Sequence, residues 1–274
     1  MNRPPRQGRF PLPLARLQGA AGPTPRVLLR PQRPLEQAAQ DAARRNVPSG
    51  LGLDSAAVRA RMVERLRGEG IADERVLAAL AGVERHRFVD PALAHQAYED
   101  TSLPIGHGQT ISKPSVVARM LALAMDGEFA RRHGHLGRVL EIGTGCGYQT
   151  ALLMQLARSV VSIERLRPLA ERARQNLAAQ AAPRSAQRPH LLHGDGRLGH
   201  APRAPYDAIV AAAGGAQVPA PWLEQLAVGG RLVAPEHAAR QGGQRLVVVD
   251  RKPTGLLHRE FDAVHFVPLK SGVE

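Results

Sequence analysis

The stretch VLEIGTGCGYQTALLM, residues 139–154, constrains the fold most, because it places three glycines between two apolar runs. Gly143, Gly145 and Gly147 follow a short β-branched run and open a longer run with helical character. Glycine inside a regular element costs about 0.5–1 kcal/mol relative to alanine, so three in five positions need a reason. Either the chain turns tightly here or a ligand lies against bare backbone, and the loop alone leaves both open.

Short β-branched runs alternate with alanine- and leucine-rich runs after residue 137. The predicted strand–helix pairs are RVLEI with YQTALLMQLA, SVVSIE with RLRPLAERARQNLAAQ, and YDAIVAAA with PAPWLEQLAV, and the further strands are PHLLHGD, GRLVAP and GQRLVVVD. Such alternation, with right-handed crossovers, builds a mostly parallel sheet covered by helices on both faces. We therefore predict a doubly wound α/β fold that binds its ligand at the carboxyl ends of the strands.

Two amphipathic helices are predicted ahead of this core. In DSAAVRARMVERLRGEG, the apolar residues Val58, Met62 and Leu66 share one helical face. ADERVLAALAGV repeats the pattern, with Asp73 as a plausible N-cap. We assign residues 54–100 to a helical leader of the main domain.

Residues 1–53 have a different composition. Residues 1–50 contain nine arginines against two acidic residues, so they carry +7 of the net charge of +13, and they also contain nine prolines. Few large apolar residues are present to offset the ordering entropy, which predicts a disordered basic extension. An arm that contacts nucleic acid or a membrane surface is the sharper alternative. Arginine bias in the coding composition weakens that alternative, because only three of the 37 basic residues are lysines.

Several protein classes are disfavoured by composition. No run reaches 18 uncharged apolar residues, and arginine and proline interrupt the apolar pieces of the first 22 residues, so neither a membrane span nor a secretory signal is predicted. A single cysteine, Cys146, excludes an internal disulfide and a thiolate metal cluster. His133 and His135 have no third ligand nearby. We expect a cytoplasmic monomer without a metal centre.

Two further acidic residues end predicted strands. Glu164 ends the second strand, 21 residues after Gly143, where a side chain can accept hydrogen bonds from both ribose hydroxyls of a nucleoside. Asp195 follows the third strand in HGDGR, where it can accept from an adenine amino group, and Gly196 allows close approach. The plainer alternatives are an ion pair of Glu164 with a neighbouring arginine, and turn formation by Asp195. Taken with the glycine loop, the two carboxylates favour adenosine binding.

The glycine spacing separates two classes of nucleotide site. A dinucleotide-binding loop requires G-x-G-x-x-G, and its third glycine would be Tyr148 here, which disfavours an NAD-dependent oxidoreductase. The observed G-x-G-x-G, preceded by Glu141, resembles the first motif of Rossmann-like S-adenosylmethionine methyltransferases.

A second motif narrows the class. SLPIGHGQTISKP at residues 102–114, with VLEIGTGCGYQTA, HGDG, YDAIV and the late FVPL, closely resembles the protein-L-isoaspartate O-methyltransferase family from about residue 58 to residue 270. The resemblance implies a repair enzyme that uses S-adenosylmethionine to methylate the free α-carboxylate of L-isoaspartyl residues in damaged proteins and peptides. It does not reach residues 1–53, which are either a genuine extension or a start site placed too far upstream.

The resemblance also implies roles for individual residues. Ser112 is the implied active-site residue, although helix capping before Pro114 is an alternative. Residues implied to bind the cofactor are Thr110, Ile111, Glu141, Gly143, Gly145, Glu164, Asp195 and Gly196. The methyltransferase domain then spans residues 54–274, with a cleft segment at 101–137 and a Rossmann-like core at 138–274.

Two rival functions remain to be weighed. The net charge favours a nucleic-acid methyltransferase, but amino-group methylation of bases usually needs a D/N-P-P-Y/F loop where this chain has Ala211 to Gly215. A non-catalytic adaptor with a basic arm is the other, and intact Ser112, Glu164 and Asp195 argue against it. Gly214 and Gly215 depart from the family pattern and are expected to loosen the edge of the cofactor site.

Overall fold

The computed structural model describes residues 56–179, 188–237 and 242–274. Its helices are α2 (Ala56–Gly68), α3 (Glu74–Gly82), α4 (Pro114–Met125), α5 (Glu128–His133), α6 (Tyr148–Leu156), α7 (Arg167–Ala178) and α8 (Ala220–Gln225). Short 3₁₀ turns are η2 (Arg85–Phe88), η3 (Pro91–Gln96), η4 (Gly196–Leu198) and η5 (Ala201–Arg203). The predicted extension at residues 1–53 lies outside the described residues. None of the described helices is long and apolar enough to cross a membrane.

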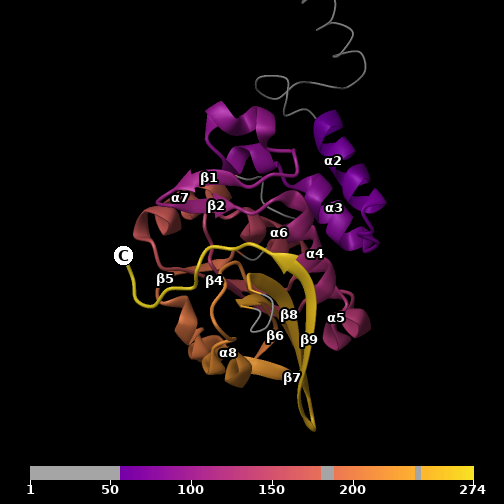
Figure 1. Ribbon diagram of the computed structural model, residues 1–274, viewed down its shortest axis with the longest axis vertical. Helices are drawn as coiled ribbons and strands as arrows, with labels where there is room; N and C mark the ends of the chain where they lie inside the picture. The colour runs from indigo at the N-terminus through magenta and orange to yellow at the C-terminus, as the bar shows by residue number, and fades with distance from the viewer. Residues whose placement is uncertain (1–55, 180–187, 238–241) are drawn as a thin grey trace, which may run out of the picture. The chain divides into compact units, whose positions relative to one another are not determined.

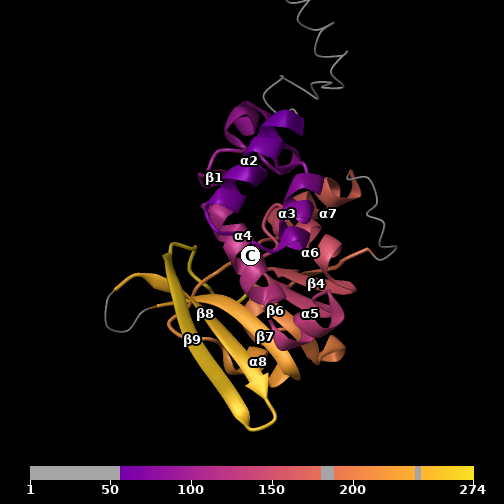
Figure 2. The same cartoon turned by 90° about the vertical axis from the view of Figure 1, so that its right-hand side faces the viewer.

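Seven strands form the central sheet, in the order β5-β4-β3-β6-β7-β8-β9. They are β3 (Arg138–Ile142), β4 (Ser159–Glu164), β5 (His190–His193), β6 (Tyr206–Ala211), β7 (Leu226–His237), β8 (Gln244–Lys252) and β9 (Gly255–Val264). The first five strands in this order are parallel, and β8 and β9 add an antiparallel edge, visible on the side of the sheet away from β4 in Figure 2. The doubly wound, mostly parallel sheet predicted from the sequence is confirmed.

The chain reverses direction across the sheet at β3. From β3 it proceeds to β4 and β5, and then returns to the other side of β3 to form β6. The connections that leave β3 and β6 therefore diverge, which opens a crevice at the carboxyl ends of these strands. The glycine loop follows β3 directly and so lies at this switch point.

Both faces of the central strands β3, β4 and β6 are buried, as expected for parallel strands. Successive residues of β3 point to opposite faces: Val139 belongs to the core shared with α4 and α6, and Leu140 to the core shared with α8. Trp222 of α8 is 1% exposed, and its indole nitrogen donates a hydrogen bond to the carbonyl of Gly196 at 2.8 Å. The second core thus holds the turn that carries Gly196.

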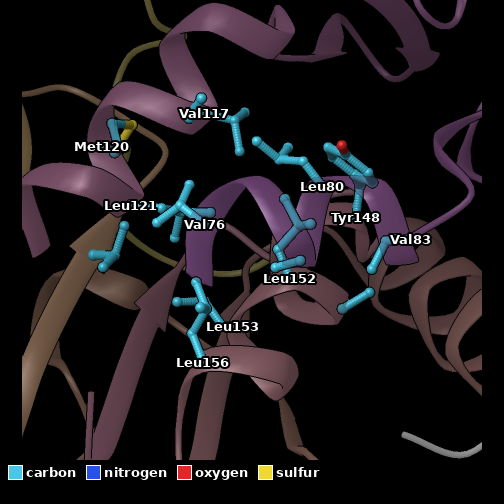
Figure 3. Packing of buried hydrophobic residues seen from close by; sticks show 14 of the residues in the cluster. Val76, Leu80, Val83, Val117, Met120, Leu121, Tyr148, Leu152, Leu153 and Leu156 are labelled. Atoms are coloured by element: carbon cyan, nitrogen blue, oxygen red, sulfur yellow. The ribbon is translucent and has the colours of Figure 1, made fainter. Parts of the chain in front are cut away.

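The helical leader shares the main core. In Figure 3, side chains of α3 lie between those of α4 and α6. Val76 and Leu80 are fully buried there, against Leu121 and Leu152. Asp73 is the N-cap of α3, as predicted, and accepts from the backbone nitrogens of Arg75 and Val76. This packing ties the leader to the helix that follows the glycine loop.

A small hairpin joins the leader to the core. It consists of β1 (Leu103–Gly106) and β2 (Gln109–Ile111) around His107 and Gly108, which both have positive φ. Positive φ at both central residues is the geometry of a two-residue turn whose twist matches its strands. The motif predicted to carry the substrate cleft therefore folds as a tight hairpin that leads into α4.

One predicted helix is shorter than expected. PAPWLEQLAV was predicted as helical throughout, but α8 ends at Gln225 and β7 begins at Leu226. The guanidinium of Arg251 donates to the carbonyls of Leu223, Glu224 and Leu226, which satisfies groups that would otherwise continue the helix. The early end of α8 therefore depends on Arg251 of β8, which is distant in sequence and could not be inferred from the helix itself.

Candidate active site

A cleft opens at the switch point of the sheet. Its empty space measures about 670 Å³, counted out to open solvent. The floor is formed by the ends of β3 and β4 and by the loop after β6, and the walls by the β1–β2 hairpin and the segment after β9. Lining residues are Ile105, Gln109, Thr110, Ile142, Gly143, Gly145, Ile163, Glu164, Arg165, Leu166, Leu169, Gly196, Ala212, Ala213, Val267, Pro268, Leu269 and Lys270.

The glycine loop makes a tight turn and also exposes backbone in the cleft. Gly143, Gly145 and Gly147 have φ values of 87°, 56° and 92°, so each occupies the left-handed region that favours glycine. Gly143 and Gly145 line the cleft, where their missing side chains leave backbone exposed to a ligand. Gly147 instead faces α7, and a Cβ there would lie 3.2 Å from Leu177. Two glycines therefore open the site and the third permits close helix packing.

Glu164 connects the second strand to the glycine loop. One carboxylate oxygen accepts the backbone N–H of Gly145 at 2.8 Å, and the other accepts that of Leu166 at 3.0 Å. The side chain is buried but lines the cleft. The alternative of an ion pair with a neighbouring arginine is wrong, because Arg165 pairs with Glu274 and Arg167 with Glu171.

Glu141 lies behind the cleft wall and is not among the lining residues. One of its oxygens accepts from the hydroxyls of Thr150 at 2.5 Å and Ser162 at 2.7 Å, and the other has no partner among the described residues. Burial raises the pKa of Glu141 to about 7, although the hydrogen bonds from Thr150 and Ser162 favour the charged form. Strand alternation points this side chain toward α6, and its connection to the glycine loop runs through Ser162, whose hydroxyl lies 2.6 Å from that of Thr144.

The turn after β5 brings only one of its two predicted residues into the cleft. Gly196 lines the cleft, and a Cβ on it would lie 2.6 Å from Ile142. The Asp195 carboxylate caps the following turn by accepting from the N–H of Arg197 at 2.9 Å. Its other oxygen accepts from the N–H of Gly272 at 2.7 Å. Asp195 thus borders the neighbouring hollow and performs the turn function that was the plainer alternative.

The three site residues predicted in and after the hairpin, Thr110, Ile111 and Ser112, differ in their exposure and in whether they line the cleft. Thr110 is exposed and lines the cleft, whereas Ile111 is 5% exposed and belongs to the core. Ser112 is half-buried, follows β2, and is not among the lining residues. The N-cap of α4 is Lys113 and uses no side-chain hydrogen bond, so the alternative that Ser112 caps this helix is wrong.

Sequence reasoning missed the segment that closes the cleft. Residues 267–270 line it, and in Figure 1 the yellow segment that follows β9 crosses toward β5. Gly214 holds this segment: its N–H donates to the carbonyl of Val267 and its carbonyl accepts from Leu269. The loop at Gly214 is therefore anchored, not loosened as its departure from the family pattern suggested. The FVPL motif marked the segment, but its residues carry no chemistry that would have placed it at the site.

These features together define a class of protein. The sheet is doubly wound, and a G-x-G-x-G loop lies at its switch point. A carboxylate at the end of the next strand holds this loop. This arrangement is that of a Rossmann-like S-adenosylmethionine-dependent methyltransferase.

Comparison with known proteins narrows the class to one family. The sequence model of the family described as Protein-L-isoaspartate(D-aspartate) O-methyltransferase (PCMT) matches residues 57–274. A protein-L-isoaspartate O-methyltransferase of Methylibium petroleiphilum is 60% identical over 267 residues, which cover 97% of this chain and 97% of that protein. One of Leptothrix cholodnii is 56% identical over 285 residues, covering 99% and 96%. The chain therefore belongs to the protein-L-isoaspartate O-methyltransferase family.

Solved structures agree with this assignment. A protein-L-isoaspartate O-methyltransferase structure superposes with a TM-score of 0.66 at 25% identity, over 78% of this chain and 67% of that one. A Plasmodium falciparum structure, described as a putative family member in complex with S-adenosyl-L-homocysteine, gives a TM-score of 0.62 at 22% identity, over 77% and 98%. The protein is an enzyme that transfers the methyl group of S-adenosylmethionine to the α-carboxylate of L-isoaspartyl residues in damaged proteins.

Replacing Gly196 by alanine should narrow the cofactor site. The new Cβ would lie 2.6 Å from Ile142, which lines the floor of the cleft, and this is closer than real Cβ contacts. We expect affinity for S-adenosylhomocysteine, measured by calorimetry, to fall about tenfold or more, because overpacking costs about 1–3 kcal/mol. Gly194→Ala is the matched control, since its Cβ would lie at an ordinary 3.6 Å from Ile163. Equal affinities for the two variants would contradict this geometry.

The raised pKa of Glu141 should make stability depend on pH. The folded-state pKa of about 7 lies above the ordinary glutamate value of 4.5, so the stabilising contribution is complete below pH 4.5 and is lost as pH rises through 7. Glu141→Gln removes this loss. We expect the free energy of unfolding of the variant, relative to wild type, to rise by an amount on the order of 3 kcal/mol between pH 4.5 and 8 in urea titrations. If the free energies of unfolding of wild type and Glu141→Gln changed in parallel with pH, the raised pKa of Glu141 would be refuted. The exposed Glu171→Gln serves as the control.

Proposed function

We propose that Ser112 positions the isoaspartyl carboxylate for attack and that the cleft residues hold S-adenosylmethionine. The observation that carries this proposal is the contiguity of the two parts: β2 lines the cofactor cleft through Thr110, and Ser112 follows two residues later, between β2 and α4. A methyl donor in the cleft and a carboxylate at Ser112 would therefore meet at the end of the hairpin.

The reaction places modest demands on acid–base chemistry. An α-carboxylate has a pKa near 3.5, so the nucleophile is already ionised at neutral pH and no strong general base is needed. One carboxylate oxygen forms a bond to the methyl carbon while the bond from that carbon to the sulfonium sulfur breaks, and both charges are neutralised. Rate then depends on in-line approach at about 3–3.5 Å and on exclusion of water. The Ser112 hydroxyl donates one hydrogen bond that orients the carboxylate without acting as a nucleophile.

The cofactor roles follow from the cleft contacts. Each oxygen of Glu164 accepts one backbone N–H and retains a second acceptor site, and we assign these free sites to the two ribose hydroxyls. Gly143 and Gly145 admit the cofactor to bare backbone, and Thr110 borders it from the hairpin. Gly196 admits the adenine end of the cofactor.

Three of the predicted cofactor residues have less direct assignments. Asp195 retains free acceptor sites for the adenine amino group at the rim of the cleft. Glu141 acts through the glycine loop that it supports, by way of Thr150 and Ser162. Ile111 acts by anchoring the hairpin in the core.

We further propose that residues 54–274 form the methyltransferase domain, that residues 1–53 are a basic extension, and that the enzyme is a cytoplasmic monomer without a specific nucleic-acid partner. The match of the family model from residue 57 supports the domain boundary. The Methylibium petroleiphilum relative aligns over 97% of this chain, so the alignment runs into the extension as well. The buried free thiol of Cys146 agrees with a reducing compartment.

Paired peptides that differ only in L-isoaspartate or L-aspartate test the assignment. With labelled S-adenosylmethionine, we expect methyl transfer to the isoaspartyl peptide alone. Ser112→Ala should lower kcat/KM for the peptide about tenfold or more, and Glu164→Ala should nearly abolish transfer because it removes both the loop support and the ribose acceptor. The exposed Ser102→Ala and Glu171→Ala are the matched controls. Wild-type rates in Ser112→Ala, or labelling of the aspartyl peptide, would reject the proposed roles.

A further inference from the structure

A carboxylate outside the cleft fixes the start of the helix that follows Ser112. Asp100 accepts the backbone N–H of Ser115 and the hydroxyl of the same residue, both at 2.8 Å. The ammonium of Lys113 lies 3.6 Å from the same carboxylate. Lys113 is the N-cap of α4 and has no side-chain capping bond of its own. Asp100 therefore supplies, from a distance of 15 residues in sequence, the acceptor that the first turn of α4 needs.

The segment that carries Asp100 is held from the core side. Arg85 is fully buried, and its Nε donates to the carbonyl of Ala97 at 2.7 Å, with a longer contact of 3.5 Å from its Nη2 to the carbonyl of Thr101. The same guanidinium lies 4.9 Å from the ring centre of Tyr148, the first residue of α6 after the glycine loop. One buried cation thus links the segment at 97–101 to the glycine loop on the cofactor side.

Ser112 is placed between two fixed points. On one side, Ile111 pairs with Leu103 in the hairpin and is buried in the core. On the other side, Asp100 holds Lys113 and Ser115. The residues on both sides of Ser112 are therefore fixed, one by the hairpin and the core, the other by Asp100.

The charge state of Asp100 suits this task. Burial alone would raise the pKa of Asp100, but the hydrogen bonds from Ser115 and the charges of Lys113 and Arg65 hold that pKa below its usual value. The carboxylate therefore remains an acceptor for both Ser115 donors at neutral and mildly acidic pH.

We propose that Asp100 is a positioning residue for methyl transfer: by clamping the first turn of α4 through Ser115 and Lys113, it sets the Ser112 hydroxyl in the direction that the incoming carboxylate requires. The inference rests on the role proposed above for Ser112. It assigns Asp100 no contact with substrate or cofactor, so its effect should appear in the turnover of peptide and not in the binding of S-adenosylhomocysteine.

The test compares two carboxylates that cap neighbouring helices. Asp100→Ala removes the clamp on α4, and the control Asp73→Ala removes the N-cap of α3. Both should lower the melting temperature by similar amounts, since loss of a cap has a similar effect at either helix. Only Asp100→Ala should lower kcat for the isoaspartyl peptide, by about tenfold, with the dissociation constant of S-adenosylhomocysteine unchanged within about twofold. Asp100→Asn, which keeps an acceptor for the Ser115 N–H, should recover at least half of the activity.

A double-mutant cycle separates positioning from general loosening. Asp100→Ala should have little further effect on kcat in a Ser112→Ala background, because it acts through the hydroxyl that is already missing. Should Asp100→Ala fold poorly, Ser115→Ala removes only the side-chain bond and should give a smaller loss, about threefold, with the same non-additivity.

The outcomes distinguish the two proposals. If Ser112→Ala is impaired and Asp100→Ala is not, or if the two effects multiply, the positioning role of Asp100 is overturned while that of Ser112 stands. If Ser112→Ala is as active as wild type, both roles fail, whatever Asp100→Ala does.

Discussion

The carboxylate of Glu164 is the interaction on which the rest of the site depends. It ends β4, yet its two oxygens accept N–H groups from the glycine loop after β3 and from the turn before α7. Charge-assisted bonds of this kind are about twice as strong as neutral ones. They join two neighbouring strand ends at the point where the sheet reverses, so the shape of the cleft is set before any cofactor enters.

The acidic residues of two adjacent strands, Glu141 of β3 and Glu164 of β4, have different environments. Glu141 is buried behind the loop, with its pKa raised to about 7, and acts as internal support through Thr150 and Ser162. Glu164 faces the cleft with acceptor sites to spare. Apolar residues such as Ile105, Ile142 and Leu169 form much of the remaining wall. Such walls exclude water from a reaction that neutralises charge, which is the chief requirement of carboxylate methylation.

Features encoded locally could be predicted from the sequence, and features made by distant residues could not. The strand–helix alternation and the Asp73 cap are local and were predicted correctly, apart from the end of α8, and the loop glycines adopt the positive φ values of a tight turn. The position of Asp195 depends on Gly272, 77 residues away, which turns its carboxylate to the rim. The end of α8 likewise depends on Arg251 in β8.

The site shows the same division. The family resemblance implied a cofactor role for Glu141, but the sequence did not show that strand alternation turns its side chain toward Thr150 of α6. The closing segment at 267–270 is held at the cleft by backbone hydrogen bonds to Gly214, more than 50 residues away in sequence. Arg85 and Asp100 belong to no recognisable motif, and their importance emerges only when the carbonyls and helix terminus that they bind are seen together.

The central claim is that the ribose of the cofactor binds the free acceptor sites of Glu164. Calorimetry of the wild-type enzyme with S-adenosylhomocysteine and with its 2′-deoxy analogue tests this most directly. Because a hydrogen bond to a charged group contributes about 1.5–3 kcal/mol, the account predicts that the analogue binds roughly 10- to 100-fold more weakly. Equal affinities for the two nucleosides would contradict it.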